Sequence, residues 1–372
     1  MKNRVVGLDI LRSLAIIWVV YMHAVSLLPQ KYWGFYFKLN FLKIDGVSLF
    51  FVLSGFLIGK IIINLFVEKS FDLKQVINFW LRRWFRTIPN YLLVLLLVLS
   101  YNIYYYQSFG EFSFKFLFFT QNFFKSHPNF FPEAWSLSVE EWFYLLLPFV
   151  FLLISKIFIL DTIIKRKRYF VLILLFFITI PFLIRLYNFE YNSTLNADID
   201  NNFRKVLIFR LDAIVYGVLG AYISFYYSTF WFKIRYLCLL ISFMILFYLF
   251  ITDKMIWYFW YLPIDFSLES LIALLLLTFF SSFSQSRFVF FDKIVIFISL
   301  ISYSMYLLNL SIVLVIIMPR FQRLLTVACN QQSIIFYITS YLFYWFFVIF
   351  FSYILYKFFE KPTTKLRDRF SM

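Results

Sequence analysis

Cysteine and histidine are almost absent from this sequence. Its 372 residues include two cysteines, Cys238 and Cys329, and two histidines, His23 and His127. The cysteines have no spacing that indicates a metal site or a redox pair. Two histidines, one of them in a predicted loop, do not suffice for a zinc or haem site. We therefore predict no metal and no permanently bound cofactor.

The sequence also lacks an internal repeat, a Gly/Ser-rich linker and a low-complexity tail, the features that would mark a second domain. Hydrophobic residues make up 63% of the chain and its mean hydropathy is +0.82. Apolar runs of near-spanning length recur from end to end, which is typical of an all-α integral membrane protein. Residues 1–372 are expected to form one polytopic bundle with no soluble domain.

Hydropathy predicts about ten membrane-spanning helices. They are expected near residues 9–29, 45–65, 88–106, 140–155, 169–187, 206–227, 234–252, 261–282, 294–317 and 334–357. With the N-terminus in the cytoplasm, the inner tails and loops hold 21 Lys and Arg residues and the outer loops hold 10. The positive-inside rule then places both termini in the cytoplasm. The same asymmetry accounts for much of the net charge of +16, so a nucleic-acid partner is not indicated.

Arg12 and His23 lie in the first predicted span, and both are ionisable. This segment lacks a small-residue cleavage site, so we expect it to be retained as a helix. Eleven residues along an α-helix bring both side chains to one face, roughly 16 Å apart along the axis. Such residues usually face the bundle interior or a watery cavity. Alternatively, Arg12 reaches a lipid headgroup and His23 bonds a neighbouring helix, but their alignment favours a functional site.

Two carboxylates, Glu140 and Glu141, stand at the start of the predicted fourth span. They follow the longest non-spanning stretch, residues 107–139, which the predicted topology places outside. Long loops of this kind often carry function. Acids in the first turn of a helix also favour its positive dipole end, an alternative that requires no chemical role.

Seven short motifs are distributed along the chain. They are Leu8–Arg12 with His23, Gly46–Phe56, Arg82–Pro89, Trp135–Tyr144, Phe209–Gly217, Ile301–Leu307 and Glu360–Pro362. In this order they resemble the membrane acyltransferase-3 family, which includes bacterial O-acetyltransferases of lipopolysaccharide and other surface glycans. The resemblance implies a multi-pass enzyme of the bacterial inner membrane, with an acyl-CoA donor inside and an acceptor hydroxyl outside. Some members carry a soluble esterase-like domain after the bundle, and none is expected in this chain.

The sequence departs from the family pattern at two positions. Ser48 stands where the family usually has Asp, and Asp45, on a neighbouring helical face, is a candidate to replace that acid. Asn309 stands where the family frequently has His. His23 is therefore the histidine that remains in a position to be catalytic.

The predicted topology gathers several arginines at the cytoplasmic surface. They are Arg12, Arg82, Arg83 and Arg86. Guanidinium groups suit the phosphates of coenzyme A through bidentate, charge-assisted bonds, so we assign them to the donor. Following the resemblance, that co-substrate is expected to be acetyl-CoA. The alternative for the last three is positive-inside signalling and contact with lipid headgroups.

The remaining candidates fall towards the outer half of the bundle. They are His23, Asp45, Glu140, Glu141, Arg210 and Asp212. A neutral imidazole commonly takes the proton of a weak nucleophile, so His23 is expected to be a base, or else a covalent nucleophile. Glu140 or Glu141 is expected to bond its other ring nitrogen. Asp45, Arg210 and Asp212 are candidates for acceptor binding, although the last two could equally form structural pairs.

Two other function classes fit parts of this pattern. Bundles with buried charges also describe a glycolipid transporter or flippase, although the absence of a repeat counts against it. A glycan polymerase or ligase combines many spans with an outer loop, but gives no reason for cytoplasmic arginines. The expected partners are acyl-CoA, a glycan or glycolipid acceptor and the lipid bilayer. The sequence does not predict an oligomeric state.

Overall fold

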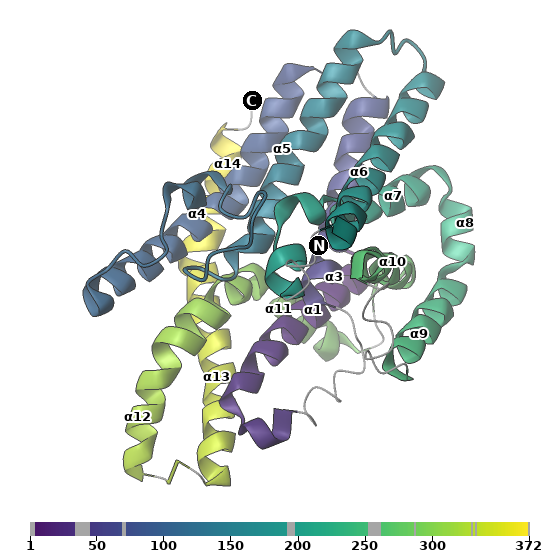
Figure 1. The fold of residues 1–372 in the computed structure, drawn as a ribbon. Coiled ribbons are helices and arrows are strands. Elements are labelled where there is room, and N and C mark those ends of the chain that lie inside the picture. The colour runs from purple at the N-terminus through teal and green to yellow at the C-terminus, as the bar shows by residue number, and fades with distance from the viewer. Residues whose placement is uncertain are drawn as a thin grey trace.

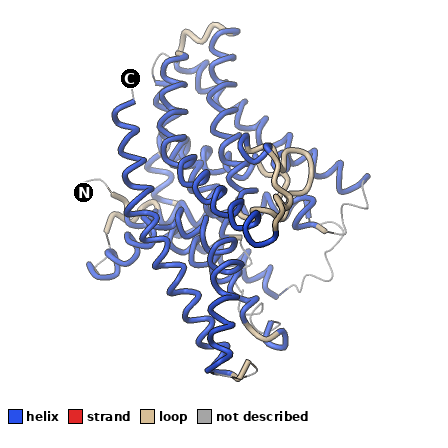
Figure 2. The backbone as a smooth tube through the Cα atoms, turned by 90° about the vertical axis from the view of Figure 1, so that its left-hand side faces the viewer, coloured by secondary structure: helices blue, strands red, loops and turns tan. Residues whose placement is uncertain are grey.

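The computed structural model describes residues 4–33, 45–68, 72–191, 198–251, 262–285, 288–328, 330–331 and 333–370. Cys329 lies outside these residues. Throughout the described residues the secondary structure is helical, with connecting loops and no strand (Figures 1 and 2). The predicted all-α polytopic fold is confirmed.

The main helices follow one another along the chain. They are α1 (Val6–Ala24), α3 (Gly46–Ile62), α4 (Leu73–Tyr106), α5 (Ala134–Ile157), α6 (Ile163–Tyr191), α7 (Leu211–Tyr226), α8 (Ser228–Lys233), α9 (Arg235–Ile251), α10 (Leu262–Phe280), α11 (Val289–Leu308), α12 (Met318–Ala328), α13 (Ile334–Leu355) and α14 (Lys361–Phe370). A long connection over residues 107–133 joins α4 to α5. Short π-helical segments occupy Ile63–Glu68, Asp200–Arg204, Asn309–Ile317 and Tyr356–Glu360.

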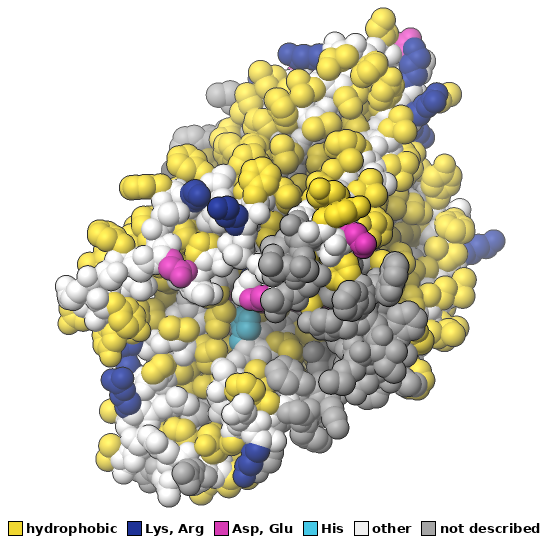
Figure 3. Space-filling model, in the orientation of Figure 1, with side chains coloured by type: hydrophobic (Ala, Val, Ile, Leu, Met, Phe, Trp, Pro, Cys, Tyr) yellow, Lys and Arg dark blue, Asp and Glu magenta, His cyan; other side chains and the backbone are white. Residues whose placement is uncertain are grey.

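Each of the ten predicted spans coincides with a helix. Eight helical stretches of the described chain are long and apolar enough to cross a membrane. The other two predicted segments correspond to α9 and α10, which are also apolar. Large exposed hydrophobic side chains occur along α6, α9 and α13, and hydrophobic side chains are widespread on the face drawn in Figure 3. Contact with lipid explains this distribution, because apolar side chains are favoured where a helix faces the bilayer.

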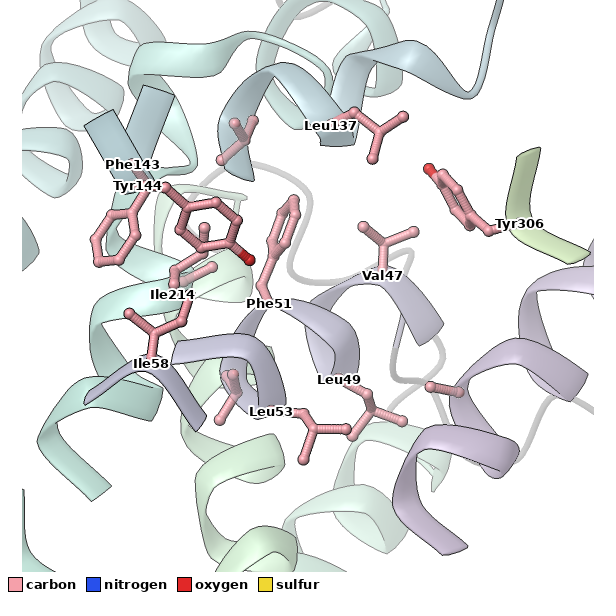
Figure 4. Packing of buried hydrophobic residues seen from close by; sticks show 14 of the residues in the cluster. Val47, Leu49, Phe51, Leu53, Ile58, Leu137, Phe143, Tyr144, Ile214 and Tyr306 are labelled. Atoms are coloured by element: carbon pink, nitrogen blue, oxygen red, sulfur yellow. The ribbon is translucent and has the colours of Figure 1, made fainter. Parts of the chain in front are cut away.

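Helix α3 lies at the centre of the bundle and packs closely against α7. A Cβ atom added at Gly55 would lie 1.9 Å from the carbonyl oxygen of Ile214. One added at Gly217 would lie 1.9 Å from the carbonyl oxygen of Val52. Glycine at these positions lets the two backbones approach, as small residues do at helix interfaces in membranes. This contact fixes α3 in the bundle, where Phe51 packs between α5 and α7 (Figure 4).

The start of α3 is set by Asp45. Its carboxylate accepts a hydrogen bond of 3.1 Å from the backbone N–H of Val47, the usual role of an acidic N-cap. Helix α5, in contrast, begins at Ala134, six residues before the predicted start of the fourth span. The additional turns place Glu140 and Glu141 within the helix rather than at its end.

Candidate active site

Three cavities form a row through the interior. The arginine cavity has a volume of about 500 Å³ and is lined by Ile61, Leu65, Gln75, Asn78, Phe79, Arg82, Arg83 and Arg86. The central cavity, of about 90 Å³, shares Arg83 and Arg86 with it. The histidine cavity, of about 610 Å³, contains His23 and shares Val47 and Tyr306 with the central cavity. Because neighbouring cavities share lining side chains, each adjoins the next.

The structure brings the four predicted donor arginines together. Arg12 lines the central cavity from α1, and Arg83 and Arg86 line it from α4. Arg82 lines the arginine cavity beside the same two residues. The guanidinium of Arg83 also lies 5.4 Å from the ring centroid of Tyr144 on α5. Four cations along one passage form a site suited to an anionic ligand.

Glu140 is placed with these arginines and not with His23. It lines the central cavity, and its Oε2 accepts a hydrogen bond of 2.8 Å from the hydroxyl of Tyr144. Glu141 accepts one of 2.6 Å from Thr87 on α4. The predicted contact of either glutamate with His23 is therefore not found. The physical reason is the early start of α5: the helix rises about 1.5 Å per residue, so Glu140 lies roughly 10 Å along the axis from Glu133, which does line the histidine cavity.

His23 contacts the side-chain amide of Asn309. Its Nδ1 lies 2.5 Å from Oδ1 of Asn309, at the start of the π-helical segment that follows α11. Ser311, in the same segment, donates to both carboxylate oxygens of Glu133, from its backbone N–H at 2.7 Å and its hydroxyl at 2.6 Å. One short segment thus contacts both the imidazole and a carboxylate of the histidine cavity.

Glu133 was absent from the sequence-based candidates. Its side chain is 2% exposed and it stands directly before the first residue of α5. Burial raises the pKa of Glu133 to about 7, although the two bonds from Ser311 favour the ionised form. The group can therefore gain or lose a proton near neutral pH. Its partner lies 178 residues away, and no local signal in the sequence indicates that contact.

Several ionic groups line the histidine cavity. Arg204 donates to Asp45 at 3.0 Å and to Asp200 at 2.7 Å, and Lys205 pairs with Asp200 at 2.5 Å. Although burial opposes it, these two cations lower the pKa of Asp200. The Arg204 guanidinium also lies 5.0 Å from the ring centroid of Trp135. The predicted acceptor residue Asp45 thus faces the cavity while capping α3 and pairing with Arg204.

The acid that contacts Ser48 is Glu269 of α10 and not Asp45, the candidate from the sequence. The Ser48 hydroxyl donates to Glu269 at 2.9 Å and accepts from Nη2 of Arg210 at 2.7 Å. Glu269 also lines the histidine cavity, whereas Arg210 is fully buried behind it. Glu269 lies 221 residues from Ser48, so the helical spacing around position 48 could not reveal it.

Asp212 forms a buried structural pair. Its carboxylate lies 2.6 Å from Nη2 of Arg185, and the two side chains are 1% and 0% exposed. Ser267 donates a further bond of 3.2 Å to it. Asp212 lines none of the three cavities. Within the described residues, no group of three or more His, Cys, Asp or Glu side chains could hold a metal ion.

The protein family that matches the whole sequence agrees with the motifs and with the helical bundle. A family model for the acyltransferase-3 domain, described as an acyltransferase domain, matches residues 5–367. The chain belongs to the acyltransferase-3 family. Membership confirms the resemblance and shows that this multi-pass membrane protein is an acyltransferase.

One relative of this acyltransferase is the peptidoglycan O-acetyltransferase OatA of Listeria monocytogenes. The two are 34% identical over 106 residues, which are 28% of this chain and 15% of that protein. The chain thus matches about one seventh of the relative's length. No solved structure matches it.

Proposed function

We propose that this enzyme transfers an acetyl group from cytoplasmic acetyl-CoA to a glycan hydroxyl on the outer side of a bacterial inner membrane. The glycan is lipid-linked or exported, such as the O-antigen of lipopolysaccharide or an exopolysaccharide. The observation that carries the proposal is the row of three cavities, with arginines at one end and His23 at the other. A glycolipid flippase, the alternative function, would not require this arrangement, and the family match favours acyl transfer.

The arginine cavity is proposed to hold the nucleotide end of the donor. Its volume of about 500 Å³ is typical of ligand pockets. Arg82, Arg83 and Arg86 offer forked donors to phosphate oxygens, and such charge-assisted bonds are the strong ones. The distribution of Lys and Arg in the loops supports a cytoplasmic opening. The thioester arm would then extend past Arg12 and Glu140 towards Tyr306.

The histidine cavity is proposed to hold the acceptor. Trp18 and Trp135 offer flat apolar faces to a sugar ring, and the carboxylates of Asp45 and Glu133 can accept bonds from its hydroxyls. The similarity to OatA favours a peptidoglycan precursor as a second candidate acceptor. Both candidates present a hydroxyl on the outer side of the membrane.

The chemical step needs a base and a route for one proton. His23 removes the hydroxyl proton while the oxygen attacks the acetyl carbon. The new C–O bond forms, the thioester C–S bond breaks, and the proton passes from His23 to the sulfur of coenzyme A. A route in which His23 first carries the acetyl group leads to the same products.

Purified enzyme in nanodiscs tests the proposal. Wild-type protein should bind acetyl-CoA and release free coenzyme A when a glycan acceptor is present. His23→Ala should lower transfer about 10²- to 10⁴-fold, the usual contribution of a general base, without weakening acetyl-CoA binding. Arg86→Ala should weaken acetyl-CoA binding about 10- to 100-fold, because it removes bonds to a charged group.

Arg168→Ala is the matched control, because Arg168 is an exposed arginine of α6 that lines none of the three cavities. It should bind and transfer as the wild type does. Transfer by His23→Ala at the wild-type rate would refute the assigned chemistry. Absence of acetyl-CoA binding in wild type would refute the proposed donor. Mass spectrometry of the surface glycan with and without the enzyme then identifies the acyl group and its position.

A further inference from the structure

Asn309 is a fully buried amide whose orientation is fixed by its neighbours. Its Nδ2 lies 2.9 Å from the carbonyl oxygen of Met305 and 2.7 Å from that of Tyr306. Carbonyl oxygens only accept hydrogen bonds, so the NH₂ end of the amide must face them. The opposite end, Oδ1, consequently points to Nδ1 of His23 at 2.5 Å.

This orientation determines the hydrogen on the imidazole. An amide oxygen only accepts, so Nδ1 of His23 has to be the donor. A neutral imidazole carries one hydrogen, and its other nitrogen is then free to accept. We propose, on the basis of the proposed function, that Asn309 is a positioning residue. It holds neutral His23 as the Nδ1–H tautomer, and this leaves Nε2 to take the acceptor's proton.

The π-helical start at Asn309 supports this role. A π-helical turn is wider than an α-helical one and is frequent at functional sites. Here Asn309 faces His23 while Ser311, two residues later, bonds Glu133. Both contacts come from this one segment, which therefore positions two groups of the same cavity.

The same contact serves both protonation states of His23. When the acceptor hydroxyl gives its proton to Nε2, the Nδ1–H still donates to Asn309 and no group has to rotate. The oxygen then forms its bond to the acetyl carbon, and Nε2 passes the proton to the leaving sulfur. An aspartate at position 309 would place a carboxylate against the carbonyls of Met305 and Tyr306, which offer it no donor. The neutral amide is thus the residue that fits.

Nitrogen NMR of histidine tests the tautomer directly. The chain has only two histidines, so protein labelled with ¹⁵N-histidine in liposomes gives two sets of imidazole signals. His127→Asn assigns them, because His127 lies in a loop outside the three cavities. At pH 8, above the ordinary imidazole pKa of about 6.5, we expect a protonated Nδ1 and an unprotonated Nε2 for His23. The reverse pattern would overturn the proposal.

Asn309→Leu provides the kinetic test. Without the amide, the His23 signals should shift towards a mixture of tautomers. We expect kcat to fall about 10- to 100-fold, the range found when the hydrogen-bonding partner of a metal-bound histidine is removed. KM for acetyl-CoA should not change, because Asn309 lines neither the arginine nor the central cavity. An unchanged kcat with an unchanged spectrum would contradict the positioning role.

Asn102→Leu is the matched control. The Asn102 amide donates to the carbonyl oxygen of Val98 on its own helix and lines none of the three cavities, so its loss should alter neither spectrum nor kcat. The two proposals fail separately, since the wild-type spectrum requires no turnover. An Nδ1–H tautomer in a protein that transfers no acetyl group would refute the proposed function alone. An Nε2–H tautomer in an active enzyme would refute this inference alone, even if Asn309→Leu did not fold.

Discussion

Replacement of Glu133 by Gln should make the enzyme more stable at alkaline pH. Glu133 is buried, and its pKa in the folded protein is about 7 against an ordinary value of 4.5. In an acid whose pKa is raised by folding, the folded state favours the bound proton. Its contribution to stability is therefore complete below about pH 4.5 and is lost as the pH rises towards 7.

The size of the effect follows from the shift. A difference of about 2.5 pKa units at about 1.4 kcal/mol each amounts to about 3 kcal/mol at pH 8. Gln is uncharged at every pH and fits the same place. Its Oε1 can accept from the Ser311 N–H, and the Ser311 hydroxyl can rotate to accept from Nε2.

Thermal unfolding in detergent, followed by tryptophan fluorescence at several values between pH 4.5 and 8, measures this difference. Wild type should lose stability relative to Glu133→Gln across that range, with most of the loss before pH 7. Parallel curves for the two proteins would refute the reasoning. Asp161→Asn is a suitable control, because Asp161 is an exposed carboxylate that lines none of the three cavities.

Three further substitutions test the fold and the site. Asp212→Ala should destabilise the protein by about 3–5 kcal/mol in thermal unfolding, because it leaves Arg185 buried without its partner. A loss of stability smaller than that of Asp161→Asn would contradict this. Gly217→Ala should lower the free energy of unfolding by about 1–3 kcal/mol or prevent folding, since the new Cβ would overlap the carbonyl of Val52. Gly220→Ala should lower it less, because its Cβ would meet the movable end of the Leu274 side chain. Glu269→Gln should lower the rate of transfer, because it removes the carboxylate beside Ser48 and Arg210. Adding Ser48→Asp to this variant should restore part of the rate. No recovery would show that the location of the acid matters more than its charge.

Hydropathy and motif order predicted much of this molecule. All ten predicted spans are helices, because long apolar runs leave the backbone no other way to satisfy its hydrogen bonds in lipid. The grouping of Arg12 with Arg83 and Arg86 was also predictable, since a shared membrane surface fixes depth. These properties depend on position along the membrane axis, which hydropathy encodes.

Lateral contacts between distant helices could not be predicted in this way. The bond of His23 to Asn309 joins residues 286 apart, and the Glu133 contact with Ser311 joins residues 178 apart. Hydropathy gives the depth of a residue but not its neighbours. It also placed the start of α5 too late, because the segment before Glu140 is only weakly apolar. That error placed Glu140 and Glu141 with His23, whereas the glutamate that lines the histidine cavity is Glu133, seven residues before Glu140.

The small volume of the central cavity has a consequence for the cell. At about 90 Å³ it is the smallest of the three cavities, and the cavities on either side measure about 500 and 610 Å³. A continuous water column through the protein would let protons and ions leak down the membrane potential. Tyr306 and Val47 close the cavity on its histidine side, and Figure 4 shows both side chains facing the region below Leu137. The side chains around the central cavity must therefore move apart to admit the proposed thioester arm, and this narrow section limits the water column whenever the arm is absent.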